Sequence, residues 1–417
     1  MNLFKIVISN LLHRPLTVLL NVVLLALSTG IIALLLHVQS QIEHKFETDL
    51  RDIDMVLGAK GSPLQLVLSA VYHVDAPTGN ISAEEVERIR KNPMVRQMIP
   101  LAYGDSYKGF RIVGTDTSYI GKYDGKMATG ALFSANMQVV IGSSVAKATG
   151  LQVGQTFHGT HGEAEEGEVH EHLDYIVSGI LSPTQSVLDQ LILTPVASVW
   201  KMHDEAEPHE DEEKQESAMA TPEHHTESEE AQGDSEAQGD LTAVLIKFRS
   251  PMGIMTLPRM VNETTKMQAA VPALEINRLM ALMGIGVTTL QGIALAIMLI
   301  SGFSVFIALY NRLKERRYEL ALLRSMGCRR STLFALLLAE GGLLALAGAA
   351  TGSLLSRVGI GVLNATAAKE MRIQLTYQWL PQEGILWGIV LLIGLLAALI
   401  PAIRAYKMNV SATLAAS

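Results

Sequence analysis

Four long apolar stretches dominate the hydrophobic pattern of the chain. Residues 16–36 carry no charged side chain, and at 1.5 Å per residue they make about 31 Å of helix, enough to cross a bilayer. Similar stretches cover about 284–310, 333–355 and 385–403. Pro15 suits the start of the first helix. A cleaved signal peptide is the competing interpretation, but its apolar region would be shorter, and no small-x-small cleavage site follows.

Shorter apolar stripes flank the first two spans. Residues 1–14 combine Leu, Ile, Val and Phe with Lys5 and Arg14, which predicts a short interfacial amphipathic helix. Helical spacing continues after the first span, at Ile42, Phe46, Leu50 and Ile53, and before the second, at Ile276, Leu279, Met280 and Met283. We expect two helical extensions that form a stalk; two unrelated surface helices are the alternative.

The long segment between the first and second spans, 58–271, mixes strand and helix patterns. Gly58, Gly61 and Pro63 indicate a turn, and Ser82 with Glu85 has the spacing of a capping box for a helix over 82–91. Strand patterns cover 95–102, 110–113, 138–141, 175–180, 191–193 and 243–248, with short helices at 144–149, at 195–201 and near Pro251. This mixture predicts an α+β domain. The short segment from Val358 to Gln382 is expected to be a loop.

Charge is distributed very unevenly. The formal net charge of the 417 residues is −8, but residues 203–240 alone hold fifteen Asp or Glu and one Lys. The rest of the chain therefore has 26 acidic and 32 basic residues, a net charge of +6. The acidic segment has almost no aliphatic residues and is expected to be a disordered insert that builds no core. A single cysteine, Cys328, excludes a disulfide framework.

The connection between the second and third spans is strongly basic. Between Asn311 and Ser331 there are seven Lys or Arg and only two Glu, so we expect this loop on the cytoplasmic side, together with both termini. Within it, Leu320, Leu323 and Met326 form an apolar stripe of a short amphipathic helix that Gly327 can end. From charge alone, the loop is equally well explained as an anchor that only holds the orientation of the protein.

A sequence resemblance decides between these interpretations. The ordered pattern over the basic loop and third span resembles permeases of the FtsX/MacB kind; its residues are Arg317, Glu319, Arg324, Gly327, Glu340, Gly348 and Gly352. In addition, FRIVGTD, VVIGSSVAKATGLQVGQTF and YIVSGIL resemble the MacB-like periplasmic core domain. The resemblance implies that 311–331 is a coupling helix, with Arg317, Glu319, Arg324 and Gly327 contacting a separate ATPase.

The resemblance also implies the organisation of the protein. Residues 1–57 would form the amphipathic helix, first span and stalk, 58–271 the periplasmic core domain, and 272–417 the second stalk helix and the FtsX-like permease domain. We expect a bacterial inner-membrane protein with a periplasmic domain, acting as a homodimer by mechanotransmission. Expected partners are the ATPase, the lipid bilayer and a periplasmic adaptor or substrate protein, but no nucleic acid.

No pattern in the chain indicates catalysis. The sequence GAKGSP at 58–63 lacks both the spacing and the Lys-Ser/Thr end of a phosphate-binding loop. ATP is therefore expected only on the partner subunit, and the chain itself is expected to be a non-enzymatic subunit without a bound cofactor. Glu340 is an acidic residue within an apolar run, where a carboxylate is costly. We expect it to pair with a loop arginine; a proton or substrate path is the alternative. Gly348 and Gly352 have the spacing of close helix contacts.

Histidines gather around the acidic insert. Eight of the twelve lie between His158 and His225, among many carboxylates, and four of them are within the insert, namely His203, His209, His224 and His225. Imidazole with carboxylate suits zinc or copper, so weak divalent metal binding is a hypothesis beside that of a plain acidic linker. No fixed ligand spacing predicts a closed structural site.

Three functions stay open from the sequence. Export or extraction of a substrate on the periplasmic side is favoured by the size of the external domain. A signalling scaffold that controls a cell-envelope enzyme, as in FtsX-type relatives, is the first alternative. A component of a zinc-linked transport system, which would use the histidine-rich insert, is the second.

Overall fold

The computed structural model describes residues 3–13, 15–160, 174–206, 239–366 and 377–407. These residues form two compact units. Met1–His44 and Ala281–Ser417 belong to the first unit, and Lys45–Met280 form the second. The first unit contains the apolar stretches, and the second contains the whole segment with mixed strand and helix patterns, 58–271.

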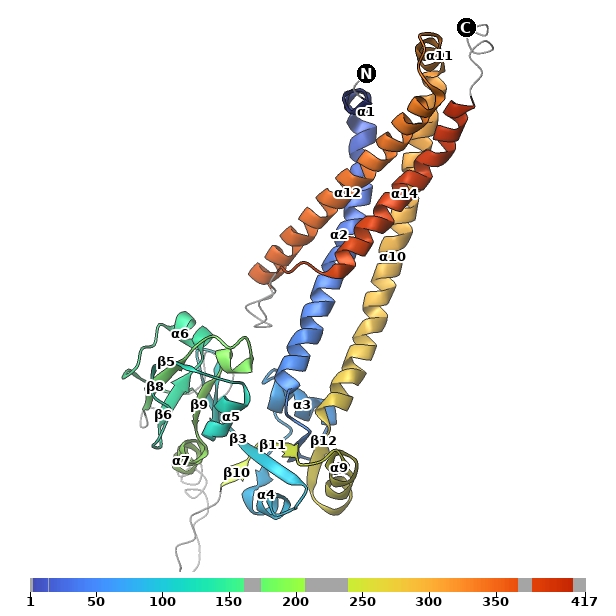
Figure 1. Ribbon diagram of the computed structural model, residues 1–417. Helices are drawn as coiled ribbons and strands as arrows, with labels where there is room; N and C mark the ends of the chain where they lie inside the picture. Colours follow the sequence, from blue (N-terminus) through green and yellow to red (C-terminus); the bar gives the residue numbers. More distant parts are fainter. Residues whose placement is uncertain (1–2, 14, 161–173, 207–238, 367–376, 408–417) are drawn as a thin grey trace, which may run out of the picture. The chain divides into compact units, whose positions relative to one another are not determined.

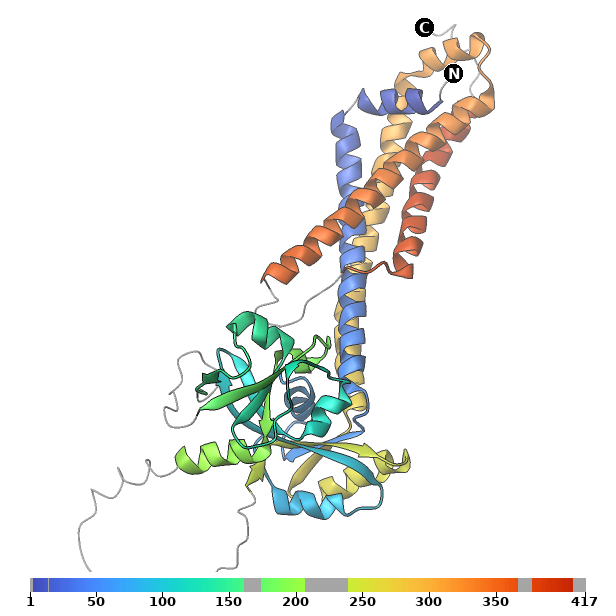
Figure 2. The ribbon, with the colours of Figure 1, turned by 60° about the vertical axis from the view of Figure 1, so that its left-hand side comes forward.

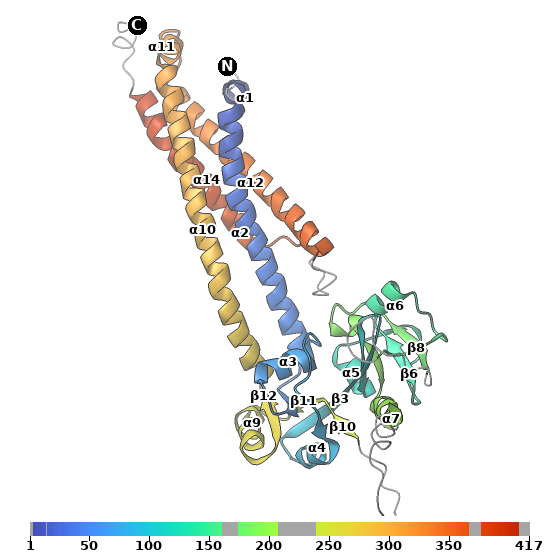
Figure 3. The same cartoon turned by 180° about the vertical axis from the view of Figure 1, so that it is seen from behind.

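The first unit is built from helices. In chain order they are α1 (Leu3–Leu12), α2 (Pro15–Leu50), α10 (Pro272–Glu315), α11 (Arg317–Ser325), α12 (Arg330–Thr366) and α14 (Pro381–Tyr406). Four of them, α2, α10, α12 and α14, are long and apolar enough to cross a membrane, which agrees with the four predicted spans. Among them, α12 crosses α2 obliquely (Figures 1 and 3), whereas α1 turns across the start of α2 (Figure 2).

Small residues let the long helices approach closely. A Cβ atom on Gly341 of α12 would lie 2.7 Å from the backbone oxygen of Gly394 in α14, and one on Gly394 would lie 2.9 Å from the oxygen of Gly341. Leu25, Met298, Leu344 and Val390 belong to the core that the four long helices share. In a membrane, such packing replaces the hydrophobic effect as the main attraction between helices.

The second unit contains a ten-stranded mixed sheet with the order β12-β1-β11-β3-β4-β9-β6-β8-β5, in which β7 pairs with β8. The strands are β1 (Met55–Ala59), β3 (Val95–Tyr107), β4 (Phe110–Thr115), β5 (Met127–Gly130), β6 (Gln138–Ile141), β7 (Thr156–Phe157), β8 (Tyr175–Leu181), β9 (Ile192–Pro195), β11 (Ala243–Phe248) and β12 (Met267–Ala270). A separate pair joins β2 (Ile81–Ser82) to β10 (Asp240–Leu241). β4 pairs with β9 and β6 with β8 in parallel, and the other pairs are antiparallel.

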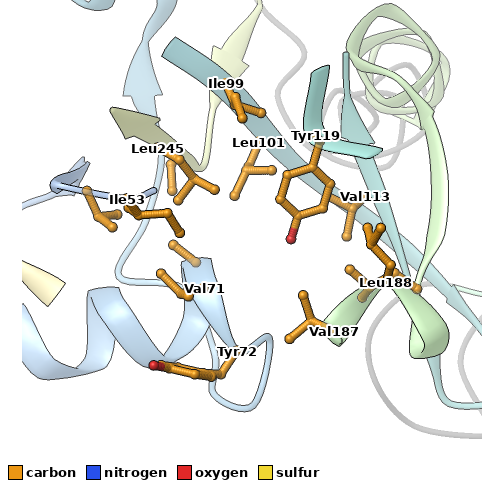
Figure 4. Close-up of a cluster of buried hydrophobic side chains, with 14 of the residues drawn as sticks. Ile53, Val71, Tyr72, Ile99, Leu101, Val113, Tyr119, Val187, Leu188 and Leu245 are labelled. Carbon is orange, nitrogen blue, oxygen red and sulfur yellow. The ribbon is translucent and has the colours of Figure 1, made fainter. Parts of the chain in front are cut away.

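Short helices complete this unit. They are α3 (Pro63–Val71), α4 (Ala83–Arg90), α5 (Thr117–Lys122), α6 (Ser143–Thr149), the 3₁₀ turn η1 (Val187–Gln190), α7 (Val196–Ala206) and α9 (Met252–Thr264). The strands and helices agree with the predicted α+β class. The largest core of the second unit joins side chains from α3, the central strands and η1 around the buried ring of Tyr119 (Figure 4).

The ends of α2 and α10 take part in the same core. Phe46 and Leu50, at the end of α2, pack against it, as do Leu279 and Met280 of α10, and Ile276 is buried in it. The predicted extensions of the first two spans are therefore real helices with a shared apolar partner. The first ends at Leu50 instead of continuing to Ile53, because Asp52 adopts a left-handed backbone with φ 65°.

Two further sequence expectations need correction. The segment 55–71 is not only a turn: Gly58 lies inside β1, where a Cβ atom would come 2.3 Å from Leu66 Cδ1 of α3. Glycine there leaves room for the Leu66 side chain against the strand and does not reverse the chain. The loop expected from Val358 is also wrong at its start, since α12 continues to Thr366. Residues 367–376 lie outside the described residues.

Candidate functional site

Helix α11 contains Arg317, Glu319 and Arg324, three of the four residues that the sequence assigns to an ATPase contact, and Gly327 follows it. Leu320 is buried in a cluster with Leu313, Leu333 and Leu337, which fixes α11 to the ends of α10 and α12. Glu319 forms an ion pair of 2.7 Å with Arg316. Arg317 is exposed and Arg324 is partly buried.

A second stripe on α11 is exposed. Tyr318, Leu322 and Met326 recur every fourth residue and are 52, 46 and 69 % exposed. Met326 was predicted to share a buried apolar stripe with Leu320, but it is exposed, because α11 ends at Ser325. The exposed stripe was missed, although the spacing of four residues from Tyr318 to Leu322 to Met326 was visible in the sequence. An exposed apolar stripe beside charges is typical of a protein–protein contact.

The turn after α11 depends on glycine. Gly327 has φ +95° and open space around it, and its amide donates to the carbonyl of Arg324 at 3.1 Å. Glycine adopts this left-handed backbone without the steric cost that other residues have. Gly327 thus separates α11 from α12, and the two are distinct helices.

Glu340 is almost completely buried on α12, with 3 % of its surface exposed. Its Oε1 accepts a hydrogen bond of 2.8 Å from Nδ2 of Asn10 on α1. The positive charges that act on this carboxylate belong to Arg312 and Arg316. Pairing of Glu340 with a loop arginine therefore stays a prediction, whereas the hydrogen bond to the amphipathic helix α1 was not indicated by the sequence.

Gly348 and Gly352 lie where α12 meets α2. A Cβ atom on Gly348 would come 2.5 Å from Leu25 Cβ, and one on Gly352 would come 2.8 Å from the oxygen of Ala26. In return, a Cβ atom on Gly30 would come 3.0 Å from the oxygen of Gly352. These glycines therefore bring two helix backbones into direct contact, as in small-xxx-small packing.

A buried polar cluster joins α2, α12 and α14 and was missed by sequence reasoning. His37 and Glu383 are each 1 % exposed, and His37 Nε2 lies 3.1 Å from Glu383 Oε1. The hydroxyl of Tyr377 donates to both oxygens of Glu383, at 3.1 and 2.9 Å. Its ring stacks on the His37 imidazole, with 4.8 Å between centroids, and the Arg357 guanidinium lies 4.2 Å from the same ring centroid.

The second unit has a polar joint at the end of α2. Asp49 is fully buried, and its carboxylate accepts a hydrogen bond of 3.3 Å from the amide of Val187 in η1. Its backbone carbonyl accepts from Lys122 Nζ and from the Tyr123 hydroxyl, both at 3.2 Å. Donors are needed there because the last carbonyls of a helix have no partner within it. The end of α2 is therefore tied to α5 and η1.

Burial lowers the pKa of Lys122 to about 7, and the negative charge of Asp49 opposes part of this effect. The Lys122 ammonium also lies 3.5 Å from the centroid of the Tyr123 ring. Lys122 lines a pocket of about 360 Å³ together with Arg51, Ser118 and Lys247. The joint therefore contains a buried amine that solvent can reach.

A neutral histidine holds the loop that follows α3. Burial lowers the pKa of His73 to about 3, so the ring carries one proton and bridges two tyrosine hydroxyls. Nδ1 lies 2.8 Å from the Tyr103 hydroxyl and Nε2 lies 2.8 Å from that of Tyr119. Tyr103 also donates to the carbonyl of Ser69. This network fastens α3 to β3 and α5, and we assign it a structural role.

The described residues contain no group of three His, Cys, Asp or Glu side chains that could hold a metal ion. His209, His224 and His225 lie outside the described residues, and His203 falls in α7. His158 pairs with Asp174 at 2.9 Å, at either side of 161–173, which also lie outside the described residues. Metal binding by the insert therefore stays a prediction.

The fold and these contacts define a multi-pass membrane protein with an α+β domain inserted between its first two spans. Residues 16–237 match the family model of the MacB-like periplasmic core domain, and residues 292–410 match that of the FtsX-like permease C-terminal domain. The chain therefore belongs to the FtsX/MacB-like family of ABC transporter permeases. Permeases of this family are generally not catalytic themselves, and the family implies both a membrane and an ATPase partner.

Two solved structures are among those similar to part of the chain. The periplasmic region of MacB from Actinobacillus actinomycetemcomitans is 11 % identical, with a TM-score of 0.33, and covers 55 % of this chain and 95 % of its own. The extracellular domain of the noncanonic ABC-type transporter YknZ from Gram-positive bacteria is 12 % identical, with a TM-score of 0.31, and covers 52 and 98 %. No curated protein matches the sequence.

Proposed function

We propose that the chain couples ATP hydrolysis on a separate subunit to movement of its periplasmic domain, and that this movement exports or extracts a substrate on the periplasmic side. One observation carries the proposal. Helices α2 and α10 are each continuous from the candidate span to a terminal segment whose side chains pack in the core of the inserted domain. A tilt of either helix would therefore move side chains that are part of this core.

In this proposal, helix α11 is the segment that binds the ATPase and receives its movement. Its buried Leu320 ties it to α10 and α12, while Tyr318, Leu322 and Met326 are exposed for a partner. Arg317, Glu319 and Arg324 add charges around the stripe, which would set the orientation of docking. Gly327 gives α11 its own direction independent of α12. In this assignment α11 and both chain termini are cytoplasmic.

The contacts of Asp49 are proposed to transmit the movement of α2 to the inserted domain. Its contacts to Lys122, Tyr123 and Val187 hold the end of α2 against two separate segments of the domain. Force applied along α2 would thus reach α5 and η1 through hydrogen bonds as well as through Phe46 and Leu50. A second copy of the chain would supply the other half of the transporter, as the family implies.

Co-purification with the ATPase tests whether α11 is its docking site. Leu322→Glu and Arg324→Glu place a carboxylate on the exposed stripe and reverse a neighbouring charge, so we expect at least a tenfold loss of ATPase binding, about 1.4 kcal/mol. Lys60→Glu, the same kind of change on an exposed residue of the inserted domain, serves as the control. Normal ATPase recovery with the double variant Leu322→Glu/Arg324→Glu would refute docking through α11.

A further inference from the structure

A pocket of about 360 Å³ is lined by the segment after α2, by α5 and by strands β3 and β11. Its volume is within the range of sites that bind small molecules, roughly 300–1,000 Å³. All of its lining residues belong to the second unit. Ile53, Ile99 and Leu245 form apolar walls from three separate segments (Figure 4), so the pocket combines apolar surface with charged side chains.

Most of the charges at the pocket are already paired. Lys247 forms a close ion pair with Asp52, and its hydrogen bond lowers the pKa of Asp52, so both groups stay charged. Arg51 lies 3.9 Å from Asp124, and both of these side chains are mostly exposed. Because the two pairs cancel, the positive charge in excess at the pocket belongs to Lys122.

The ammonium group of Lys122 has room for a further acceptor. It carries three hydrogens, of which one is donated to the Asp49 carbonyl at 3.2 Å, and its nitrogen lies 3.5 Å from the centroid of the Tyr123 ring. The Asp49 carboxylate is paired with Lys45 instead, at 3.6 Å. Within the part of the chain that the structure describes, Lys122 forms no ion pair. A carboxylate in the pocket would supply one through a charge-assisted hydrogen bond.

We propose that this pocket binds a small organic carboxylate, which accepts a hydrogen bond from the Lys122 ammonium. The body of the ligand would contact the apolar walls, and the amide of Gln97, which lines the same pocket, would supply an uncharged donor. A monoanion fits the single charge in excess, whereas a phosphate dianion would bring a charge without a counter-charge against apolar walls. The proposal concerns the inserted domain alone and does not depend on coupling to an ATPase.

Fluorine nuclear magnetic resonance of para-fluorobenzoate, added to the full chain in phosphatidylcholine nanodiscs, tests the site. The ligand signal should broaden and saturate, beyond any effect of empty nanodiscs, and Lys122→Met should weaken binding roughly tenfold or more, as expected for loss of a charged donor. Lys201→Met, at an exposed lysine of α7, is the matched control and should bind like the wild type. Equal binding by Lys122→Met and the wild type overturns the site.

Two related compounds test the chemical class of the ligand. The neutral para-fluorobenzamide has the same apolar body without the charge, so it should bind much more weakly. The dianion para-fluorophenyl phosphate should also bind more weakly than the carboxylate, because only one positive charge is in excess. Equal binding of the amide, or tighter binding of the phosphate, overturns the assignment to a carboxylate.

The pH dependence of the unaltered chain tests the site even if Lys122→Met does not fold. Burial lowers the pKa of Lys122 to about 7, and benzoate stays charged well above its own pKa. The other ionisable groups that face the amine or line the pocket are those of Asp49, Arg51, Asp52, Tyr123, Asp124 and Lys247. Binding should weaken about tenfold from about pH 6 to about pH 8, because the ammonium form of Lys122 is lost over this range.

Bound carboxylate should in turn favour the ammonium form. Saturating benzoate should therefore move the acylation midpoint of Lys122 to higher pH, measured by mass spectrometry of peptides from the full chain, and leave that of Lys201 in place. Binding that is unchanged between these pH values, or a Lys122 midpoint that does not move with benzoate, overturns the site.

Discussion

The ammonium group of Lys122 donates a hydrogen bond of 3.2 Å to the backbone carbonyl of Asp49, where α2 ends. This contact places an amine that burial has shifted to a pKa of about 7 at the point where the stalk helix meets α5. The joint therefore changes its charge within the range of ordinary pH, and its chemistry can be followed without knowledge of the substrate.

The reactivity of Lys122 toward an acylating reagent should report this shift. The rate follows the neutral amine, so labelling should rise through a midpoint near pH 7, measured by mass spectrometry of peptides from the full chain. The exposed amine of Lys201 supplies the reference. The negative charge of Asp49 favours the ammonium form, so Asp49→Asn should move the midpoint to lower pH. A midpoint that moves upward in this variant would contradict the assignment of the pair.

The contact between α2 and α12 at Gly352 predicts a penalty for a single methyl group. In Gly352→Ala, the new Cβ would meet the oxygen of Ala26 at 2.8 Å, so the helices must separate, at a cost of about 1–3 kcal/mol. Gly361→Ala is the matched control, since the same helix has open space there. Both variants gain the same helix propensity, up to about 1 kcal/mol. Melting temperatures in detergent should fall for Gly352→Ala only, and equal temperatures would show that the backbones are not in contact.

The hydrogen bond from Asn10 to Glu340 predicts that α1 contributes to the thermal stability of the helical unit. Asn10→Ala removes a donor from a buried carboxylate, which should cost about 1–3 kcal/mol. Glu340→Gln in the same background should recover part of this loss, because a neutral amide tolerates burial better. Ser9→Ala, at an exposed neighbour on α1, is the control. Equal thermal stability of Asn10→Ala and Ser9→Ala would exclude a stabilising role for the bond.

The sequence predicted the elements whose signal is local. Apolar runs identified α2, α10, α12 and α14, and short strand-like runs placed β6 and β11 at their observed bounds. The family and the fold class are confirmed. In contrast, β1 was missed because Gly58 looks like a turn residue until Leu66 of α3 is placed against it.

Polar contacts between residues far apart in the sequence could not be predicted from local sequence patterns. His37 and Glu383 each look like an ordinary residue near the end of an apolar run, and nothing in either local sequence indicates the other. The same holds for Asn10 with Glu340 and for Asp49 with Lys122. Helix packing brings these partners together, so their pairing is a property of the tertiary structure and not of any periodic pattern.

The proposed orientation can be tested at the single cysteine of the chain. Cys328 lies between α11 and α12 and is partly buried. The basic loop that surrounds it should be cytoplasmic, because Lys- and Arg-rich short loops are retained on that side. In intact cells, Cys328 should therefore react with membrane-permeant thiol reagents and remain unlabelled by impermeant ones.

A cysteine on the inserted domain gives the opposite expectation. Asn136→Cys, at an exposed position, combined with Cys328→Ser, should react with impermeant reagents once they reach the periplasm. A reporter inserted after Lys214 should likewise be active only outside the cytoplasm. Because the ATPase must meet α11 where ATP is available, labelling of Cys328 by an impermeant reagent in intact cells would place α11 on the wrong side. That result would contradict the docking of the ATPase on Tyr318, Leu322 and Met326. Labelling of Asn136→Cys by the impermeant reagent, with Cys328 unlabelled in the wild type, would support both the orientation and the proposed direction of coupling.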